Sequence, residues 1–273
     1  VEYAAHFNRK GIRIDFALQT NGLAITEEWC EFFAKNHFLI GISIDGLREI
    51  HNTYLHTKAG EDTYERILKT TQLFDKYHVE YNVLTVIHRE TAQQIKDIYR
   101  HYRENGWDYM QFITCLDPLG EARGQKTYSL LPQMYGQFLI DLFDMWYDDL
   151  NCGKAPFVRQ FENYIGILLG HMPESCEQRG TCGIQYVVEA DGGVYPCDFY
   201  VLDEWKLGNF NENRIDDIDE MRKDKGFLER SRNHPQSCRA CRWFALCRGG
   251  CYRSRLGEEE PDTGLNHFCE GYK

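Results

Sequence analysis

The sequence lacks three features that would point to common classes of protein. It has no run of about 18 apolar residues, so we expect no membrane-spanning helix. Its first ten residues, VEYAAHFNRK, contain no signal-peptide core, so we expect a cytosolic protein. Basic residues are in deficit, because 31 Lys and Arg stand against 42 Asp and Glu, a formal net charge of -11. This balance argues against a nucleic-acid binder, which usually carries a basic surface.

Cysteine, in contrast, is abundant. The chain has 11 cysteines, and disulfides rarely persist in the cytosol, so metal ligation is the leading explanation. Eight of them fall into two groupings, Cys176-x5-Cys182 followed by Cys197, and Cys238-x2-Cys241-x5-Cys247-x3-Cys251 followed by Cys269. Eight thiolates match two four-cysteine sites. The remaining three are Cys30, Cys115 and Cys152.

The hydrophobic pattern predicts two kinds of organisation. Strands are expected at 12–20, 38–45, 79–87 and 108–116, and helices at 26–36, 63–78, 92–106 and 132–150. This alternation predicts an α/β fold in which helices cover a parallel sheet. After about residue 151 the alternation stops. A helix at 157–171, a hairpin within 181–201 and a loop-rich, cysteine-dense remainder are expected there, and such loops need an internal staple.

Three of the expected strands end in small polar residues and glycine. These ends are Gln19-Thr20-Asn21-Gly22, Ser43-Ile44-Asp45-Gly46 and Thr114-Cys115-Leu116-Asp117-Pro118. Parallel α/β units place ligand sites at the carboxyl ends of their strands. Each segment alone is compatible with ordinary turn chemistry. Three of them at the same edge favour a binding site.

The spacing of the cysteines leaves the identity of the metal open. Sites with four cysteines hold either zinc or iron–sulfur clusters. A zinc ribbon usually shows two C-x2-C pairs, and this sequence has one, at Cys238 and Cys241. Spacing therefore favours neither metal.

Two segments carry a resemblance to a known family. The run from Cys238 to Cys251 and the segment Gly192-Gly193-Val194-Tyr195-Pro196-Cys197-Asp198 resemble the SPASM domain of radical S-adenosylmethionine enzymes. Together with LQTNG, ISIDG, QFITCLDP and YPCDFYVLDEW, in this order, they make the whole chain resemble the anaerobic sulfatase-maturating enzymes. The resemblance implies three parts. Residues 1–150 would form a partial (βα) barrel that lacks its first strands, residues 151–175 a linker helix and residues 176–273 a SPASM domain.

The resemblance also implies cofactors and their ligands. A first auxiliary [4Fe–4S] cluster would be held by Cys176, Cys182, Cys197 and Cys251. A second would be held by Cys238, Cys241, Cys247 and Cys269. S-adenosyl-L-methionine would bind at the strand ends, with Ser43 at its methionine part, Leu116 near its adenine and Gln19 on the same rim.

The implied activity is the oxidation of a cysteine or serine in a client sulfatase to Cα-formylglycine. A deoxyadenosyl radical would remove a hydrogen from the side-chain Cβ, and Asp198 would act as the base for the thiol or hydroxyl proton. A nearby cluster would accept the second electron. The partners would be a sulfatase segment of the Cys-x-Pro-x-Arg type and an electron donor such as ferredoxin or flavodoxin.

The sequence departs from this family in two places. It contains no Cys-x3-Cys-x2-Cys triplet for the radical-generating cluster, since Ser254 follows Cys251 at the required spacing. We therefore expect a fragment that is inactive alone, with a third cluster only in a missing N-terminal part. Leu55 also stands where the family has an arginine. Two alternatives remain open: another peptide-modifying SPASM enzyme, which forms a thioether or crosslink, and a zinc-stapled, non-catalytic binding module.

Overall fold

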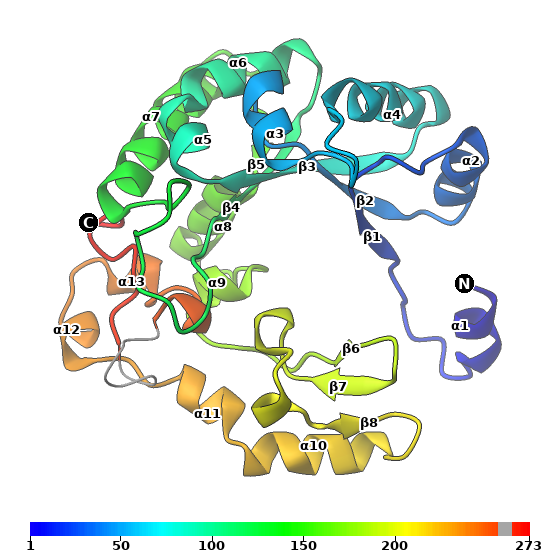
Figure 1. Ribbon diagram of the computed structural model, residues 1–273. Coiled ribbons are helices and arrows are strands. Elements are labelled where there is room, and N and C mark those ends of the chain that lie inside the picture. Colours follow the sequence, from blue (N-terminus) through cyan, green and yellow to red (C-terminus); the bar gives the residue numbers. More distant parts are fainter. Residues whose placement is uncertain (256–263) are drawn as a thin grey trace. The chain divides into compact units, whose positions relative to one another are not determined.

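The computed structural model describes residues 1–255 and 264–273 of the chain (Figure 1). These residues divide into two compact units, Val1–Glu162 (unit 1) and Asn163–Lys273 (unit 2). The division falls inside the stretch that the sequence analysis assigned to a linker. Among the described residues, none of the helices combines the length and the apolar character that a membrane crossing requires.

Unit 1 is built on a parallel sheet of five strands in the order β1-β2-β3-β4-β5. The strands are β1 (Ala17–Thr20), β2 (Leu39–Ser43), β3 (Glu80–Ile87), β4 (Tyr109–Thr114) and β5 (Phe157–Val158). The helices are α1 (Glu2–Phe7), α2 (Glu27–Lys35), α3 (Arg48–Tyr54), α4 (Tyr64–Tyr77), α5 (Arg89–Gln93), α6 (Ile95–Glu104) and α7 (Pro132–Asn151), followed by α8 (Arg159–Leu168) across the boundary. Figure 1 shows α2, α4, α6 and α7 along one side of the sheet. The predicted α/β fold with a partial barrel is confirmed.

Three details of unit 1 differ from the expectation. The first strand begins at Ala17 rather than at residue 12. The helix expected at 92–106 is two helices, α5 and α6. The short strand β5 precedes α8, where only a helix was expected. A strand of two residues carries no detectable alternation, so its pairing with β4 decides its conformation.

The alternation of β2 shows how the sheet acquires two different faces. Ile40 and Ile42 are fully buried on the helix side, where a Cβ added to Gly22 would lie 3.0 Å from Ile42 Cδ1 and 3.4 Å from Thr70 Cγ2 of α4. Successive side chains of a strand point to opposite faces, so Gly41 and Ser43 belong to the other face. The sheet therefore packs one face against helices and offers the other to a ligand.

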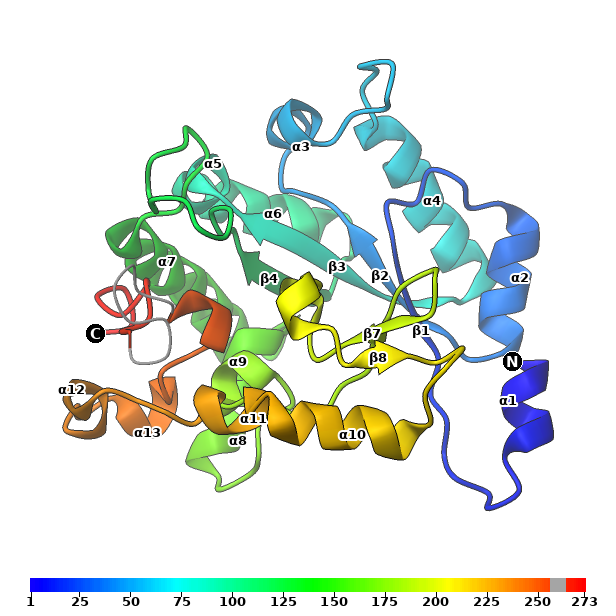
Figure 2. The same cartoon turned by 60° about the horizontal axis from the view of Figure 1, so that its bottom comes forward.

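Unit 2 has little regular structure. Its antiparallel sheet contains β6 (Val187–Val188), β7 (Gly193–Tyr195) and β8 (Gly208–Asn209). Its helices are α9 (Cys176–Arg179), α10 (Ile215–Asp224), α11 (Phe227–Ser231), α12 (Gln236–Arg239) and α13 (Phe244–Cys247), with 3-10 turns η1 (Asp198–Tyr200), η2 (Asp203–Trp205) and η3 (Tyr252–Ser254). Figure 2 shows α10 running beside β8. The predicted hairpin is present as β6 and β7, and β8 was not predicted.

Two small cores lie within unit 2. One consists of Val194, Leu207 and Ile218, which join the sheet to α10. The other consists of Tyr200, Phe227 and Tyr252, with Cys182 and Cys197 packed against it. The second core therefore contacts two of the predicted cluster ligands directly.

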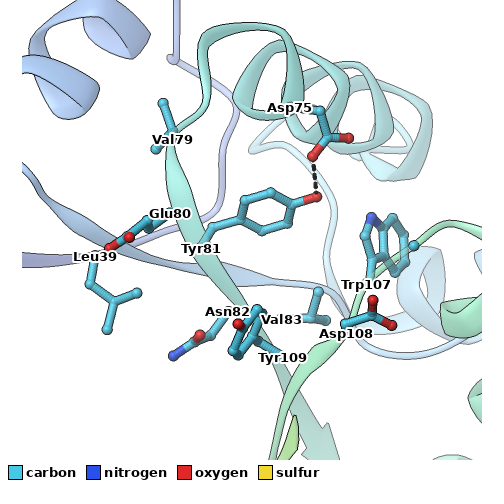
Figure 3. Close-up of a pocket in the computed structure, with 11 residues that line it drawn as sticks. Leu39, Asp75, Val79, Glu80, Tyr81, Asn82, Val83, Trp107, Asp108 and Tyr109 are labelled. Atoms are coloured by element: carbon cyan, nitrogen blue, oxygen red, sulfur yellow. Dashed lines mark hydrogen bonds between the residues drawn. The ribbon is translucent and has the colours of Figure 1, made fainter. Parts of the chain in front are cut away.

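A cavity of about 390 Å³ lies at the amino ends of β3 and β4 (Figure 3). The Tyr81 hydroxyl donates a hydrogen bond to Asp75 Oδ1 at 2.9 Å beside it. Ser43 lies at the carboxyl end of β2, which is the opposite end of the sheet. None of the predicted site residues lines this cavity.

Candidate active site and cluster sites

The structure places Gln19, Ser43 and Leu116 at the same edge of the sheet in unit 1. Gln19 is the penultimate residue of β1, Ser43 ends β2, and Leu116 follows β4 by two residues. A Cβ added to Gly41 would lie 3.3 Å from Gln19 Cγ and 2.6 Å from Leu84 Cδ1. Gln19 and Leu84 therefore cover Gly41 on the face that Ser43 shares. Only glycine allows that close approach.

A buried network behind this edge fixes the turn after Ser43. The Asp45 carboxylate accepts the backbone N–H of Val86 at 2.7 Å, and the Asp45 N–H donates to His51 Nδ1 at 3.1 Å. His51 Nε2 lies 3.0 Å from Thr63 Oγ1. Burial raises the pKa of Asp45 to about 6 and lowers the pKa of His51 to about 4. Both residues hold the turn after Ser43 in place at this edge of the sheet. From the sequence alone, Asp45 was expected only as part of a turn or a binding segment.

The loop after β4 is held by a second buried carboxylate. Asp117 accepts the N–H of Gly124 at 2.7 Å and the hydroxyl of Ser129. This arrangement fixes the half-buried Leu116 next to it. Burial, followed by the charge of Asp117, raises the pKa of Cys115 to about 11, so this thiol stays protonated at neutral pH.

The hydrogen bond of Leu55 described here is made by its backbone. It follows α3, and its carbonyl accepts the Thr63 hydroxyl at 2.6 Å. The neighbouring His56 forms a β-bridge with Asp62. The side chain of Leu55 supplies no charge-assisted hydrogen bond, as its chemistry requires.

The first predicted ligand set comes together in unit 2. Burial is the largest cause of raised thiol pKa values, to about 11 for Cys182 and about 12 for Cys251, and it raises that of Cys197 further. Neighbouring thiolates add to this effect. Cys176 and Cys182 act on Cys251, and Cys251 acts on Cys197. These effects connect four cysteines, of which the first and the last are 75 positions apart in the sequence.

The second set lines its own cavity in unit 2. Its members, with the aromatic side chains that surround them, are Cys238, Cys241, Cys247, Cys269, Trp243, Phe244 and Tyr272. The cavity measures about 60 Å³. Burial raises the pKa of Cys247 to about 11, and the other three cysteines of the set add to this shift. The four thiols therefore face a common small space.

The chemistry of both sets fits iron–sulfur clusters. Each supplies four thiols, the number that a [4Fe–4S] cluster takes. Beside the first set, Tyr200 Oη and Arg255 Nε are buried without a hydrogen-bond partner, and cluster sulfurs are acceptors for such donors. In the part of the chain that the structure describes, no three His, Cys, Asp or Glu side chains are close enough to hold a single metal ion. The fit of the two sets to clusters therefore depends on the four thiols of each set and on the unpartnered hydrogen-bond donors beside the first set.

Asp198 lies immediately beside the first set. It begins η1 and is exposed. The Cys197 thiol donates to Asp198 Oδ1 with an Sγ–O distance of 3.1 Å. This carboxylate is exposed and adjacent to a predicted cluster ligand, which is the arrangement expected of the predicted base.

Two family models match the chain. One describes the radical SAM superfamily and matches residues 2–102. The other describes the SPASM iron-sulfur cluster-binding domain and matches residues 179–242. The two matches fall in unit 1 and unit 2, respectively.

Known proteins resemble the chain over its whole length. It is 43% identical to the cysteine-type anaerobic sulfatase-maturating enzyme of Clostridium perfringens strain 13, over 100% of this chain and 74% of that protein. It is 30% identical to the serine-type enzyme of Bacteroides thetaiotaomicron, over 96% of this chain and 67% of that protein. A solved structure of anSMEcpe with bound AdoMet and a Cp18Cys peptide matches with a TM-score of 0.95 and 42% identity, covering 99% of this chain and 75% of that one.

Proposed function

The chain belongs to the anaerobic sulfatase-maturating enzymes of the radical SAM superfamily, and from this premise we propose that its client residue is cysteine. As in other members of this family, the activity is that of an oxidoreductase that generates Cα-formylglycine in a sulfatase. The observation that carries the proposal is the difference in identity, 43% to a cysteine-type enzyme against 30% to a serine-type enzyme. Neither a crosslinking enzyme nor a zinc-stapled module has comparable support.

The residues at the strand ends would bind the first cofactor. When bound, S-adenosyl-L-methionine supplies the radical that removes hydrogen, and the auxiliary [4Fe–4S] clusters supply an electron acceptor. Ser43 offers a hydroxyl, and Gln19 an amide, to the polar methionine part. Leu116 offers an apolar surface to the flat adenine ring. Cys176, Cys182, Cys197 and Cys251 would hold the first cluster, and Cys238, Cys241, Cys247 and Cys269 the second.

Asp198 is the proposed base. It would take the thiol proton of the client cysteine, which requires hydrogen-bond contact between the carboxylate and the sulfur. Its exposed carboxylate and its contact with Cys197 support this role. The client thiolate would then be close to the first auxiliary cluster, which is the proposed acceptor of its electron.

The charge pattern of unit 2 supports an acidic electron carrier as partner. Residues 230–255 contain seven arginines and no Asp or Glu, in a chain with 42 acids, and four of these arginines are exposed. Arg239 and Arg242 are exposed and adjoin Cys238 and Cys241. We propose that an acidic ferredoxin or flavodoxin docks there, in the cytoplasm, where thiols remain reduced.

The test compares two peptides that differ in one atom. Protein expressed anaerobically from its complete reading frame is given a Cys-x-Pro-x-Arg peptide and its Ser-x-Pro-x-Arg counterpart, and the aldehyde is measured by mass spectrometry. We expect the cysteine peptide to react at least about tenfold faster. Faster reaction of the serine peptide would reverse the client assignment. Another modification without aldehyde would favour the crosslinking alternative.

The base is tested by Asp198→Asn. This change should lower the rate of aldehyde formation by about 10²–10⁴-fold and leave the iron content unchanged. Asp203→Asn, an exposed carboxylate in the next 3-10 turn, is the matched control and should keep the rate. An Asp198→Asn enzyme with normal turnover would remove Asp198 from the mechanism.

A further inference from the structure

Arg255 is the largest side chain of unit 2 that is fully buried. It follows η3, and 2% of its surface is exposed. Transfer of a cation from water into a protein interior is costly unless an opposite charge compensates for it. Arginine keeps its proton in proteins, so this cost cannot be avoided by neutralisation.

Among the residues that the structure describes, Arg255 forms hydrogen bonds only with neutral groups. Nη1 donates to the Asn233 carbonyl at 2.9 Å and lies 3.0 Å from His234 Nδ1. Nη2 donates to the carbonyls of Ser231 at 2.6 Å and Gly180 at 3.3 Å. Nε is buried without a partner. Across residues 1–255 and 264–273, no carboxylate forms an ion pair with this guanidinium.

The contacts of Arg255 place it beside both cysteine sets. Gly180, whose carbonyl it binds, precedes Cys182 by two residues. A Cβ added to Gly249 would lie 3.6 Å from Arg255 Cδ, and Gly249 is two residues from both Cys247 and Cys251. The anionic groups that raise the Arg255 pKa against the lowering effect of burial include Cys182 and Cys251 of the first set and Cys238 of the second.

We propose that Arg255 is a counter-cation shared by the two auxiliary clusters, and that it raises the reduction potential of both. A [4Fe–4S] cluster with four thiolates carries a net negative charge, which increases by one unit on reduction. A buried cation stabilises the more negative, reduced form more strongly, because its field is weakly screened there. The inference rests on the proposed occupancy of the two sets by such clusters.

This arrangement has a consequence for the proposed reaction. The electron that leaves the client must find an acceptor of sufficiently high potential, and two clusters of similar potential allow it to pass from one to the other. One cation between the two sets shifts both potentials in the same direction. Arg255 thereby keeps the two clusters matched while making each a better acceptor. It acts through the clusters and is a positioning residue.

The test is a redox titration of the 273-residue chain, reconstituted with iron and sulfide and followed by electron paramagnetic resonance. This chain has no Cys-x3-Cys-x2-Cys triplet, so the signals come from the two proposed sets. In Arg255→Met, we expect both midpoint potentials to fall by at least about 59 mV, which is a tenfold change in a one-electron equilibrium. Arg255→Lys should retain most of the wild-type potentials. Arg232→Met removes an exposed charge from the same segment and should leave both unchanged.

Two results would overturn the proposal. They are unchanged potentials in Arg255→Met with a full complement of about eight irons, and a shift confined to one cluster. If Arg255→Met does not retain iron, Arg255→Gln is titrated with the same two criteria, because its amide still donates to backbone carbonyls. The redox titration contains no client peptide. Failure to form formylglycine and failure of this proposal are therefore separate outcomes.

Discussion

Unit 1 is organised around a five-stranded parallel sheet, whereas the strands of unit 2 contain two or three residues each. The sheet of unit 1 buries whole apolar side chains from several helices, including Phe33, Phe74 and Phe138. The two cores described in unit 2 have three buried members each. Hydrophobic burial is thus sufficient to order unit 1, while unit 2 needs cross-links between its loops.

The buried polar groups differ in the same way. In unit 1, Asp45 and His51 hydrogen-bond to each other and to protein neighbours. In unit 2, Arg255 Nε and Tyr200 Oη are buried without protein acceptors, beside thiols. The comparison indicates that protein groups complete the hydrogen bonds of Asp45 and His51 in unit 1, whereas the unpartnered donors of Arg255 and Tyr200 in unit 2 lie beside thiols.

The largest expected effect comes from Cys251→Ser. Loss of one ligand should release the first cluster, lower the iron content from about eight to about four per chain, and reduce hydrogen-exchange protection in unit 2. Unit 1 should keep its protection. The exposed Cys152 is the matched control, and Cys152→Ser should retain all the iron. Full iron content in Cys251→Ser would contradict the proposed ligand set.

The converse change is Phe138→Ala in α7. Phe138 is fully buried, with its ring centroid 5.5 Å from that of Phe112. Its truncation should destabilise unit 1 by about 3–5 kcal/mol in denaturant unfolding, without change in iron content. Phe143→Ala, on the same helix but 43% exposed, should cost less. Loss of iron in Phe138→Ala would show that the units are not independent.

A smaller effect concerns the pH dependence of unit 1. Burial raises the pKa of Asp45 to about 6 in the folded state, above about 3.9 in the unfolded chain. The folded state therefore binds this proton more tightly, and its stability falls as pH rises from about 4 to about 6. Asp45→Asn removes this loss and still accepts the Val86 N–H.

Urea unfolding at pH 4 and pH 7 measures the difference between Asp45→Asn and the wild type. The variant should gain up to about 3 kcal/mol relative to the wild type across this pH window. Burial lowers the pKa of His51 to about 4. The contribution of His51 to stability therefore decreases as pH falls, and it does so in the wild type and in the variant alike. An equal difference at the two pH values would contradict the assignment to Asp45.

The smallest effect is expected from Lys76→Ala. Lys76 Nζ lies 3.0 Å from Glu27 Oε1 in unit 1, and both side chains are more than half exposed. Solvent and salt screen such a pair, so the free energy of unfolding should remain almost unchanged. Unfolding at low and high salt measures it. A loss as large as that in Phe138→Ala would contradict the expectation that this exposed pair contributes little to the stability of unit 1.

Local patterns in the sequence determined much of the protein. The periodicity of long apolar segments specified the α/β fold, because alternation and helical spacing are local properties. The cysteine groupings together with Tyr195-Pro196-Cys197-Asp198 identified the family. Strands β5 and β8 were not predicted, because two residues show no alternation of apolar and polar side chains and their pairing partners are distant in sequence.

Only the tertiary structure decided how charge is placed. Asp45 reads as a turn residue and Arg255 as one more basic residue in an arginine-rich segment, yet both are buried. Their environments are made by Val86 for Asp45, and by Gly180 and Ser231 for Arg255. Such contacts bring together residues far apart in the chain. The cost of burying charge depends on these neighbours, so the sequence alone could not reveal it.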